Sequence, residues 1–196
     1  MADATAATAF YRDAFGLDGL VRVRQSDAPT EGFRGFTLSL TVSQPGNAAA
    51  LLHAAVAAGA TVIKPAAKSL WGFGGTVQAP DGTIWKVATT AKKDTAPVER
   101  RFDGMVLLLG AEDVGASKRF YVEHGLKPGK SFGSYVEFDT GASPIKLGLY
   151  KRRALAKDAG VPEEGRGSHR IAINGDAAFT DPDGFAWEVL SRAAAS

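Results

Sequence analysis

The chain has 196 residues, of which 45% are hydrophobic and 22% are charged, values typical of a globular protein with one large domain or two small ones. The formal net charge of +2 is too small to indicate a nucleic-acid or membrane-surface partner, and the absence of cysteine excludes disulfides and thiolate metal sites. No apolar run approaches 18 residues and the N-terminus lacks the pattern of a signal peptide, so we expect a cytoplasmic protein.

The first predicted element is a helix end that has a counterpart in the second half of the chain. Residues 9–17, AFYRDAFGL, match residues 119–126, RFYVEHGL. Gly16 and Gly125 stand after the matched aromatic residues, and glycine readily adopts the left-handed conformation that ends helices. Both segments therefore predict a helix that ends at glycine.

A second matched pair of segments follows these helices. Residues 29–32, PTEG, match residues 162–165, PEEG. Each segment precedes an apolar run that predicts a strand, over residues 36–42 in the first half and 169–174 in the second.

The two halves then differ. Residues 47–58 are rich in alanine and carry apolar side chains at helical spacing, which predicts a helix. Residues 60–64 predict a strand that Pro65 should end, because proline cannot donate a ladder hydrogen bond. The second half has no counterpart to the helix over residues 47–58.

The most informative repeat comes next. Residues 75–87, GTVQAPDGTIWKV, match residues 177–189, AAFTDPDGFAWEV, and each segment predicts a strand, a Pro-Asp-Gly turn and a second strand. The two copies differ in charge at one position, where Lys86 stands in the first and Glu188 in the second.

The remaining predicted elements lie between these hairpins. Residues 91–99 are polar and contain Pro97, which favours a linker. Residues 105–109 form a strong apolar strand pattern, and residues 134–139 and 144–150 predict two further strands.

These motifs resemble the vicinal oxygen chelate superfamily, which includes glyoxalase I, bleomycin-resistance proteins and extradiol dioxygenases. The resemblance rests on the helix with Phe120 and Tyr121 that ends at Gly125, and on the Asp-Pro-Asp-Gly turn at residues 181–184 followed by Trp187. It extends over most of the chain because both features have a copy in the first half.

The resemblance implies an α+β fold of tandem βαβββ modules, paired into curved, incompletely closed barrels around a cleft. We expect one half over residues 1–92, a linker over residues 93–100 and a second half over residues 101–196. The first module, near residues 1–27, is incomplete, and the last, near residues 168–192, lacks its helix. Exposed strand edges in incomplete modules predict self-association into a homo-oligomer.

Metal-dependent members of the superfamily take their ligands from inward-facing strand positions, and the resemblance places His169 and Glu188 at two of these. The strand within residues 101–109 supplies no third donor. In the first half Lys86 replaces the glutamate, and Phe36 stands opposite His169 in the repeat. A protonated lysine cannot ligate a cation, so the first half is not expected to bind metal.

Structural roles compete with ligation at both residues. A histidine at a strand end often bonds to backbone, and a carboxylate such as Glu188 often forms an ion pair, here with Arg170 or Lys146. We therefore expect no cofactor, with a divalent metal at His169 and Glu188 as the alternative.

Aromatic residues near the expected cleft are the candidates for ligand binding. If Glu188 faces the cleft, strand alternation places Trp85 and Trp187 in the core and turns Lys86 toward the first cleft. The candidate ligand-binding residues are Trp71, Phe73, Phe132, Tyr135, Tyr150 and Lys86.

The sequence leaves three functions open. The first is a glyoxalase-like protein without metal that holds a planar organic molecule in an aromatic-lined cleft, as in sequestration of the bleomycin-resistance type. The second is a metal-dependent lyase, isomerase or dioxygenase. The third is a structural or regulatory protein with a vestigial cleft, because one fold hosts many functions.

Overall fold

The computed structural model describes residues 3–17 and 19–189. The start of the first predicted half, residues 1–2, and the end of the second, residues 190–196, lie outside the described residues. The helices of the described part are α1 (Ala4–Phe15), α2 (Pro45–Ala57), α3 (Val114–Glu123) and α4 (Arg152–Ala159). Its strands are β1 (Thr30–Gly32), β2 (Phe36–Thr41), β3 (Thr61–Ser69), β4 (Gly72–Gln78), β5 (Ile84–Thr89), β6 (Gly104–Ala111), β7 (Lys127–Phe132), β8 (Tyr135–Asp139), β9 (Ile145–Lys151), β10 (Gly165–Gly167), β11 (Ala172–Gly175), β12 (Phe179–Thr180) and β13 (Ala186–Val189).

Local sequence sets the ends of the repeated helices. The Asp3 side chain accepts hydrogen bonds from the first free amides of α1, as an N-cap residue does. Gly16 ends α1 in the left-handed conformation, with φ of 67°, and Gly125 follows α3 with φ of 91°. The predicted helix ends are therefore confirmed.

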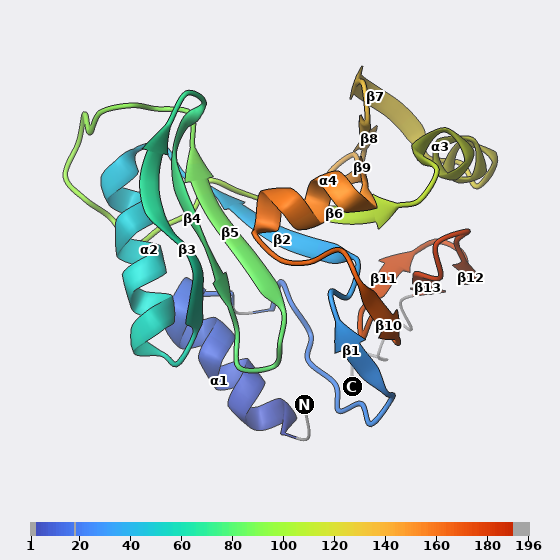
Figure 1. Ribbon diagram of the computed structural model, residues 1–196, viewed down its shortest axis with the longest axis horizontal. Coiled ribbons are helices and arrows are strands. Elements are labelled where there is room, and N and C mark those ends of the chain that lie inside the picture. Colours follow the sequence, from blue (N-terminus) through green and yellow to red (C-terminus); the bar gives the residue numbers. More distant parts are fainter. Residues whose placement is uncertain (1–2, 18, 190–196) are drawn as a thin grey trace.

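Two βαβββ modules share one mixed sheet (Figure 1). The first module is β2-α2-β3-β4-β5 and the second is β6-α3-β7-β8-β9, and the strand order is β3-β4-β5-β2-β6-β9-β8-β7. The modules meet where β2 pairs with β6 in an antiparallel register that runs from Phe36 opposite Leu109 to Thr41 opposite Gly104. The predicted fold class is confirmed, and the sheet is not closed into a barrel. The joint lies between strands of the two predicted halves, whose boundaries stay a prediction.

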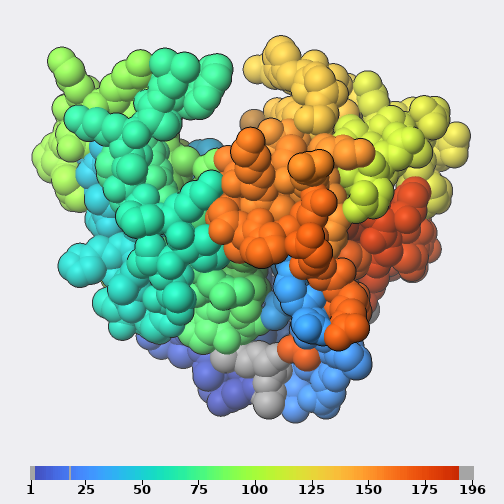
Figure 2. All heavy atoms as spheres, in the orientation of Figure 1, coloured from blue at the N-terminus to red at the C-terminus, as the bar shows by residue number. Residues whose placement is uncertain are grey.

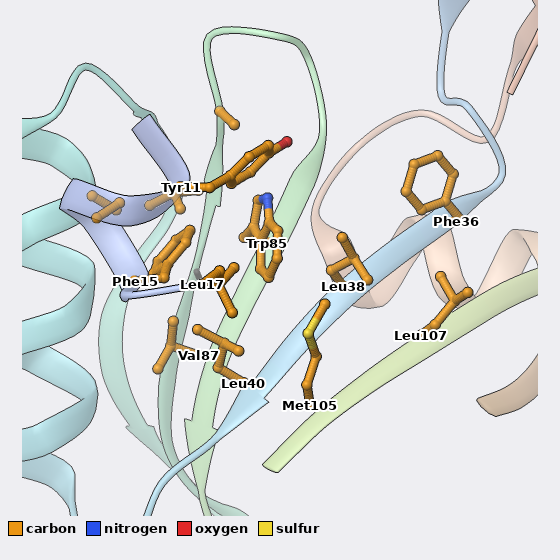
Figure 3. Close-up of a cluster of buried hydrophobic side chains, with 14 of the residues drawn as sticks. Tyr11, Phe15, Leu17, Phe36, Leu38, Leu40, Trp85, Val87, Met105 and Leu107 are labelled. Carbon is orange, nitrogen blue, oxygen red and sulfur yellow. The ribbon is translucent and has the colours of Figure 1, made fainter. Parts of the chain in front are cut away.

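One face of this sheet, here called the outer face, builds the main core. Leu38 and Leu40 of β2 alternate onto it, together with Trp85 of β5 and Met105 of β6 (Figure 3). Trp85 is fully buried, and its ring centroid lies 4.9 Å from that of Phe15 in α1. The predicted core role of Trp85 is confirmed, and α1, α2 and α3 cover this face.

The opposite face, here called the inner face, carries α4. Leu155, Ala156 and Ala159 of α4 form a second buried cluster with Phe33 and Ile84. In Figure 1, α4 lies across β2 and β6, over the joint between the modules. The inner face is therefore partly filled by a segment that follows the last strand of the second module.

The strand predicted to end before Pro65 continues to Ser69, so that prediction was wrong. β3 is an edge strand that pairs with β4 alone, and its register shifts on either side of Lys64. Proline is tolerated at such edges and bulges because the amide that it lacks would face away from the sheet. The other edge, β7, also contains proline and lysine, and both residue types discourage edge-to-edge pairing. Self-association stays a prediction.

Each repeated helix is fastened to a Pro-Asp-Gly turn by a tyrosine–aspartate contact, although the aspartate lies within the turn sequence in the first copy and directly before its proline in the second. The Tyr11 hydroxyl donates to the Asp81 carboxylate, and the Tyr121 hydroxyl donates to the Asp181 carboxylate. Asp181 is almost fully buried and also accepts the backbone N–H of Phe185 at 2.7 Å. Both copies thus hold the helix on the turn through the matched tyrosine, with aspartates from different positions of the repeat.

The segments outside the two modules form smaller sheets. β11, β13 and β12 make a three-stranded sheet beside α3, and β1 pairs with β10 in a two-stranded ribbon. In this ribbon Gly32 lies opposite Gly165, which is its counterpart in the repeat. A β-carbon on Gly32 would lie 2.4 Å from the Glu164 carbonyl oxygen, so glycine is required there. Within residues 3–17 and 19–189, no helix is long and apolar enough to cross a membrane.

We predict that the two tyrosine contacts make the protein sensitive to alkali. Burial, followed by the nearby aspartate, raises the pKa of Tyr11 and Tyr121 above the ordinary value of 10.0. A raised pKa means that this stabilisation is fully present below pH 10 and is lost as the pH rises further. The free energy of unfolding should fall above pH 10 by up to about 1.4 kcal/mol per pH unit for each tyrosine.

Urea unfolding between pH 8 and 11 measures this slope. The Tyr11→Phe/Tyr121→Phe double variant should be less stable at pH 8 but should lose less stability on going to pH 11. Equal slopes in the two proteins would contradict the prediction.

Candidate functional site

Strand alternation defines the inner face of the second module. Val136 and Phe138 of β8 and Leu147 and Leu149 of β9 point into the core, so their neighbours point to the opposite face. These neighbours are half-buried or exposed, apart from Gly148. The inner-face residues of β8 and β9 are Tyr135, Glu137, Lys146, Gly148 and Tyr150.

Two lysines of the first module hold the C-terminal end of α4. Lys86 Nζ on β5 lies 2.9 and 2.7 Å from the two carboxylate oxygens of Asp158. Lys64 Nζ on β3 donates to the carbonyls of Lys157 and Asp158, at 2.9 and 2.7 Å. A cation is favourable at a helix C-terminus because the last carbonyls carry a partial negative charge. The predicted cleft residue Lys86 thus faces the inner side and contacts α4.

The part of the inner face beyond α4 is open. Figure 2 shows a hollow between the tip of the β3–β4 hairpin, in teal, and the β7–β8 region, in gold, with the orange α4 segment below it. Both hairpins end in large exposed apolar side chains. Leu70 and Trp71 in the β3–β4 turn are 78% and 82% exposed, and Phe132 at the end of β7 is 71% exposed.

Three of the predicted aromatic residues come together on the second module. Phe132 is the register partner of Tyr135, which is the partner of Tyr150. The Tyr135 and Tyr150 rings lie 6.2 Å apart at 83°, an edge-to-face arrangement. Burial, followed by the neighbouring Glu137, raises the pKa of Tyr135, so its hydroxyl stays a hydrogen-bond donor. We call Phe132, Tyr135 and Tyr150 the aromatic row.

The two other aromatic candidates lie elsewhere. Trp71 belongs to the first module, at the hairpin tip on the other side of the hollow. Phe73 packs against the main core, so its side chain lies on the outer face, away from Tyr135 and Tyr150. The structure therefore groups four of the five aromatic candidates around the inner face and separates Phe73 from them.

The charged position that differs between the two hairpins makes an ion pair in both. Lys86 pairs with Asp158, and Glu188 receives two hydrogen bonds from the Arg24 guanidinium, at 2.9 and 2.6 Å. These hydrogen bonds hold the pKa of Glu188 below its usual range. Each pair joins one predicted half to the other, and in both pairs the first half supplies the cation and the second half the carboxylate. The prediction of an ion pair for Glu188 is confirmed, but the predicted partners, Arg170 and Lys146, were wrong. The actual partner, Arg24, lies 164 positions earlier in the chain.

His169 is held by backbone carbonyls. Its Nδ1 lies 2.5 Å from the Arg34 oxygen and its Nε2 lies 3.0 Å from the Asp183 oxygen, and its ring stacks on Phe185 with centroids 4.0 Å apart. A neutral imidazole has one N–H to donate to a carbonyl and one lone pair to offer to a metal, and here a carbonyl oxygen occupies the space in front of each nitrogen. In both His169 and Glu188, the atoms that would ligate a metal ion contact other groups of the protein. The two residues therefore do not fit a metal ion in this arrangement.

The feature that the sequence analysis missed is α4. Leu155, Ala156 and Ala159 have helical spacing, and Gly160 follows them with φ of 87°, so a helix with a glycine end was visible in the sequence. Its position on the inner face was not visible, because that depends on Lys64 and Lys86, more than 60 residues earlier.

Comparison with solved structures shows that the fold of this chain is similar to that of glyoxalase I from Zea mays. A point mutant of that protein matches with a TM-score of 0.58 and 13% sequence identity, over 96% of this chain and 88% of that chain. Glyoxalase I from Zea mays in another crystal structure matches with a TM-score of 0.54 and 13% identity, over 95% and 88% of the two chains. The chain has the glyoxalase fold.

The fold that the resemblance to the vicinal oxygen chelate superfamily implies is thereby confirmed. No protein-family model matches the sequence and no curated protein matches it, so the likeness rests on the structure. In this glyoxalase-fold protein the inner face of the shared sheet is the candidate site, with α4 across one part of it and the aromatic row along another.

We predict that the Lys86–Asp158 pair helps to hold α4 on the sheet. Lys86→Glu should lower the free energy of unfolding by about 0.5–1 kcal/mol, because it replaces a partly exposed ion pair with two like charges. The double variant Lys86→Glu/Asp158→Lys should recover most of that loss, as measured by urea unfolding.

Lys146→Glu is the matched control, since Lys146 lies on the same face and has no ion-pair partner within the described residues. An equal loss in Lys146→Glu, or no recovery in the double variant, would contradict the role given to the pair.

Proposed function

We propose that this protein binds a small planar organic molecule in the open part of the inner face, without using a metal ion. The observation that carries the proposal is the aromatic row of Phe132, Tyr135 and Tyr150 beside an open hollow. Ligand sites combine a largely apolar or aromatic lining with a few polar groups that fix orientation.

The aromatic row offers surface that a planar ligand can cover. Phe132 is mostly exposed, and Tyr135 and Tyr150 are half-buried, so their rings keep area that contacts no other part of the described protein. Stacked or edge-on aromatic contacts contribute about 0.5–1.5 kcal/mol each beyond the burial of area. A flat ring is the ligand shape that uses this row best.

Trp71 supplies a second aromatic surface from the other module. Leaving a tryptophan 82% exposed at a hairpin tip gives no benefit to the isolated fold, and aromatic residues are enriched at binding surfaces. Because the β3–β4 tip and the β7–β8 region border the same hollow, a ligand on the aromatic row would lie within the space that Trp71 flanks.

Polar groups beside the row provide specificity. Glu137 and Lys146 stand on the same face as Tyr135 and Tyr150, on neighbouring strands. Lys146 has no ion-pair partner within the described residues, so its ammonium group is available to a ligand carbonyl or carboxylate. A planar molecule with an acidic or carbonyl group fits this combination.

The contacts of the metal candidates support the metal-free form of the proposal. Both ring nitrogens of His169 face carbonyls and both oxygens of Glu188 face Arg24, so ligation would require these contacts to break. Holding a ligand without chemistry corresponds to sequestration of the bleomycin-resistance type. The fold shared with glyoxalase I is the observation that favours the second candidate, a metal-dependent lyase, isomerase or dioxygenase.

Trp71 fluorescence tests the proposal. Trp85 and Trp187 are buried, so the solvent-exposed component of the emission comes from Trp71. Titration with a panel of planar aromatic acids should quench or shift this component for at least one member. Tyr150→Ala should weaken that binding about tenfold, which corresponds to the loss of one aromatic contact and the area beneath it.

Val122→Ala serves as the control, because Val122 is an exposed apolar residue on α3, over the outer face. Elemental analysis of the same preparation should find far less than one metal ion per chain. Stoichiometric metal that is lost in Glu188→Gln would replace the proposal with the enzyme alternative, and equal binding by the Tyr150→Ala variant would refute the assigned surface.

A further inference from the structure

We propose that a small cavity between the β1–β10 ribbon and the start of α4 binds a tetrahedral oxyanion, such as phosphate or sulfate. The cavity has a volume of about 40 Å³, and its wall includes Arg34, Arg152, Arg166, Ser168 and His169. No residue of the aromatic row lines it, so this site is separate from the proposed ligand surface and does not rest on it.

The guanidinium of Arg152 is fixed in place with part of its donor capacity unused. Its Nη2 donates to the Phe33 carbonyl at 2.8 Å, its Nε donates to the Glu163 carbonyl at 3.2 Å, and it lies 5.2 Å from the centre of the Phe33 ring. Among the described residues, Nη1 has no hydrogen-bond partner. Two neutral carbonyls therefore orient the guanidinium, and the carboxylate beside it is that of Glu112, which is 75% exposed and lies 3.7 Å from Nε.

Arg34 adds a second, half-buried cation. Its Nη2 donates to the Asp81 carbonyl, and within the described part of the chain its Nε and Nη1 have no hydrogen-bond partner. Burial lowers the pKa of Arg34, with Asp81 opposing this shift and Arg170 adding to it. A cation that has lost water and has unused donors beside a cavity is stabilised by an anion in that cavity.

Arg166 stands at the exposed side of the cavity. It pairs with Glu31 through Nε at 2.7 Å and through Nη2, and its side chain is 83% exposed. The Ser168 hydroxyl accepts the Arg170 N–H at 3.1 Å and keeps its own hydrogen for a further partner. The residues that line the cavity therefore include three arginines and one serine hydroxyl, and oxyanions prefer such donors.

Two glycines fix the shape of the wall. A β-carbon on Gly165 would lie 2.0 Å from the Phe33 oxygen, and one on Gly167 would lie 2.3 Å from the Pro29 oxygen. These close approaches require glycine and leave little freedom in the ribbon. The donors are thus held by a tightly packed backbone, which reduces the entropy lost when an anion binds.

The volume suits one small anion. A cavity needs about 10–15 Å³ to hold a water molecule, so 40 Å³ corresponds to about three waters, close to the four oxygens of phosphate or sulfate. The same group could arrive as free anion or as the phosphate of an ester whose remainder extends past Arg166. Both sources share the chemistry that the arginines recognise.

Calorimetric titration and thermal unfolding at constant ionic strength test the inference on the full chain. Sodium phosphate at 20 mM should raise the melting temperature by several degrees over sodium chloride of equal ionic strength, because an anion that binds the native state stabilises it. Arg166→Ala should raise the phosphate Kd several-fold without changing the melting temperature in chloride. Arg152→Gln should raise the Kd tenfold or more.

Arg153→Ala is the matched control, since Arg153 is the next residue of α4, is 83% exposed and does not line the cavity. Its phosphate Kd should equal that of the unmodified chain. No advantage of phosphate over chloride, or equal losses in Arg153→Ala and Arg166→Ala, would overturn the proposal. Titration with phenyl phosphate distinguishes the two sources of the anion. A lower Kd than for inorganic phosphate indicates a phosphate ester, and a higher Kd indicates the free anion. Either result supports an oxyanion site.

Discussion

The antiparallel pairing of β2 with β6 is the contact on which the rest of this structure depends. It turns two βαβββ modules into one sheet, so that the cores of the two modules become one outer-face core and their other surfaces become one inner face. Every residue of the candidate site is placed by this joint: Trp71 belongs to the first module and the aromatic row to the second, and they border one hollow because the strands between them are continuous. If each module formed its own sheet, the two inner faces would be separate and smaller, and no surface would be shared between the modules.

The inner face has one part that α4 covers and another part that is open. Near the joint, α4 buries Leu155 and Ala159 against the sheet, and the lysines of β3 and β5 hold its C-terminal end. Farther along β8 and β9 the face is uncovered and aromatic. The two hairpin copies carry opposite charges at one position, Lys86 in the first and Glu188 in the second. Each of these residues forms an ion pair that connects its strand to the other half of the chain. A position at which the resemblance places a metal ligand forms a structural contact here, and the open part of the face is where we propose that a ligand binds.

The sequence predicted what is local or repeated. The ends of α1 and α3 followed from glycine, and the two hairpins followed from Pro-Asp-Gly turns between alternating apolar residues, which also placed Trp85 in the core. The partner of β2 did not follow from the sequence, because several strands share the same alternation and pairing depends on global packing. The position of α4 and the pair between Arg24 and Glu188 were hidden for the same reason. The residues of the aromatic row were predicted as separate candidates. The register of β7, β8 and β9 places them side by side.

A cross-link between the two central strands tests the joint most directly. The chain has no cysteine, and Ser39 of β2 lies opposite Val106 of β6 on the inner face. Directly opposed residues of antiparallel strands are close enough for a disulfide. The Ser39→Cys/Val106→Cys variant should therefore form a disulfide within one chain under mild oxidation, detected by faster migration in a non-reducing gel. Ser39→Cys/Leu107→Cys, whose second side chain points to the outer face, should form none. Cross-links only between chains, or a cross-link in the second variant alone, would contradict the shared sheet.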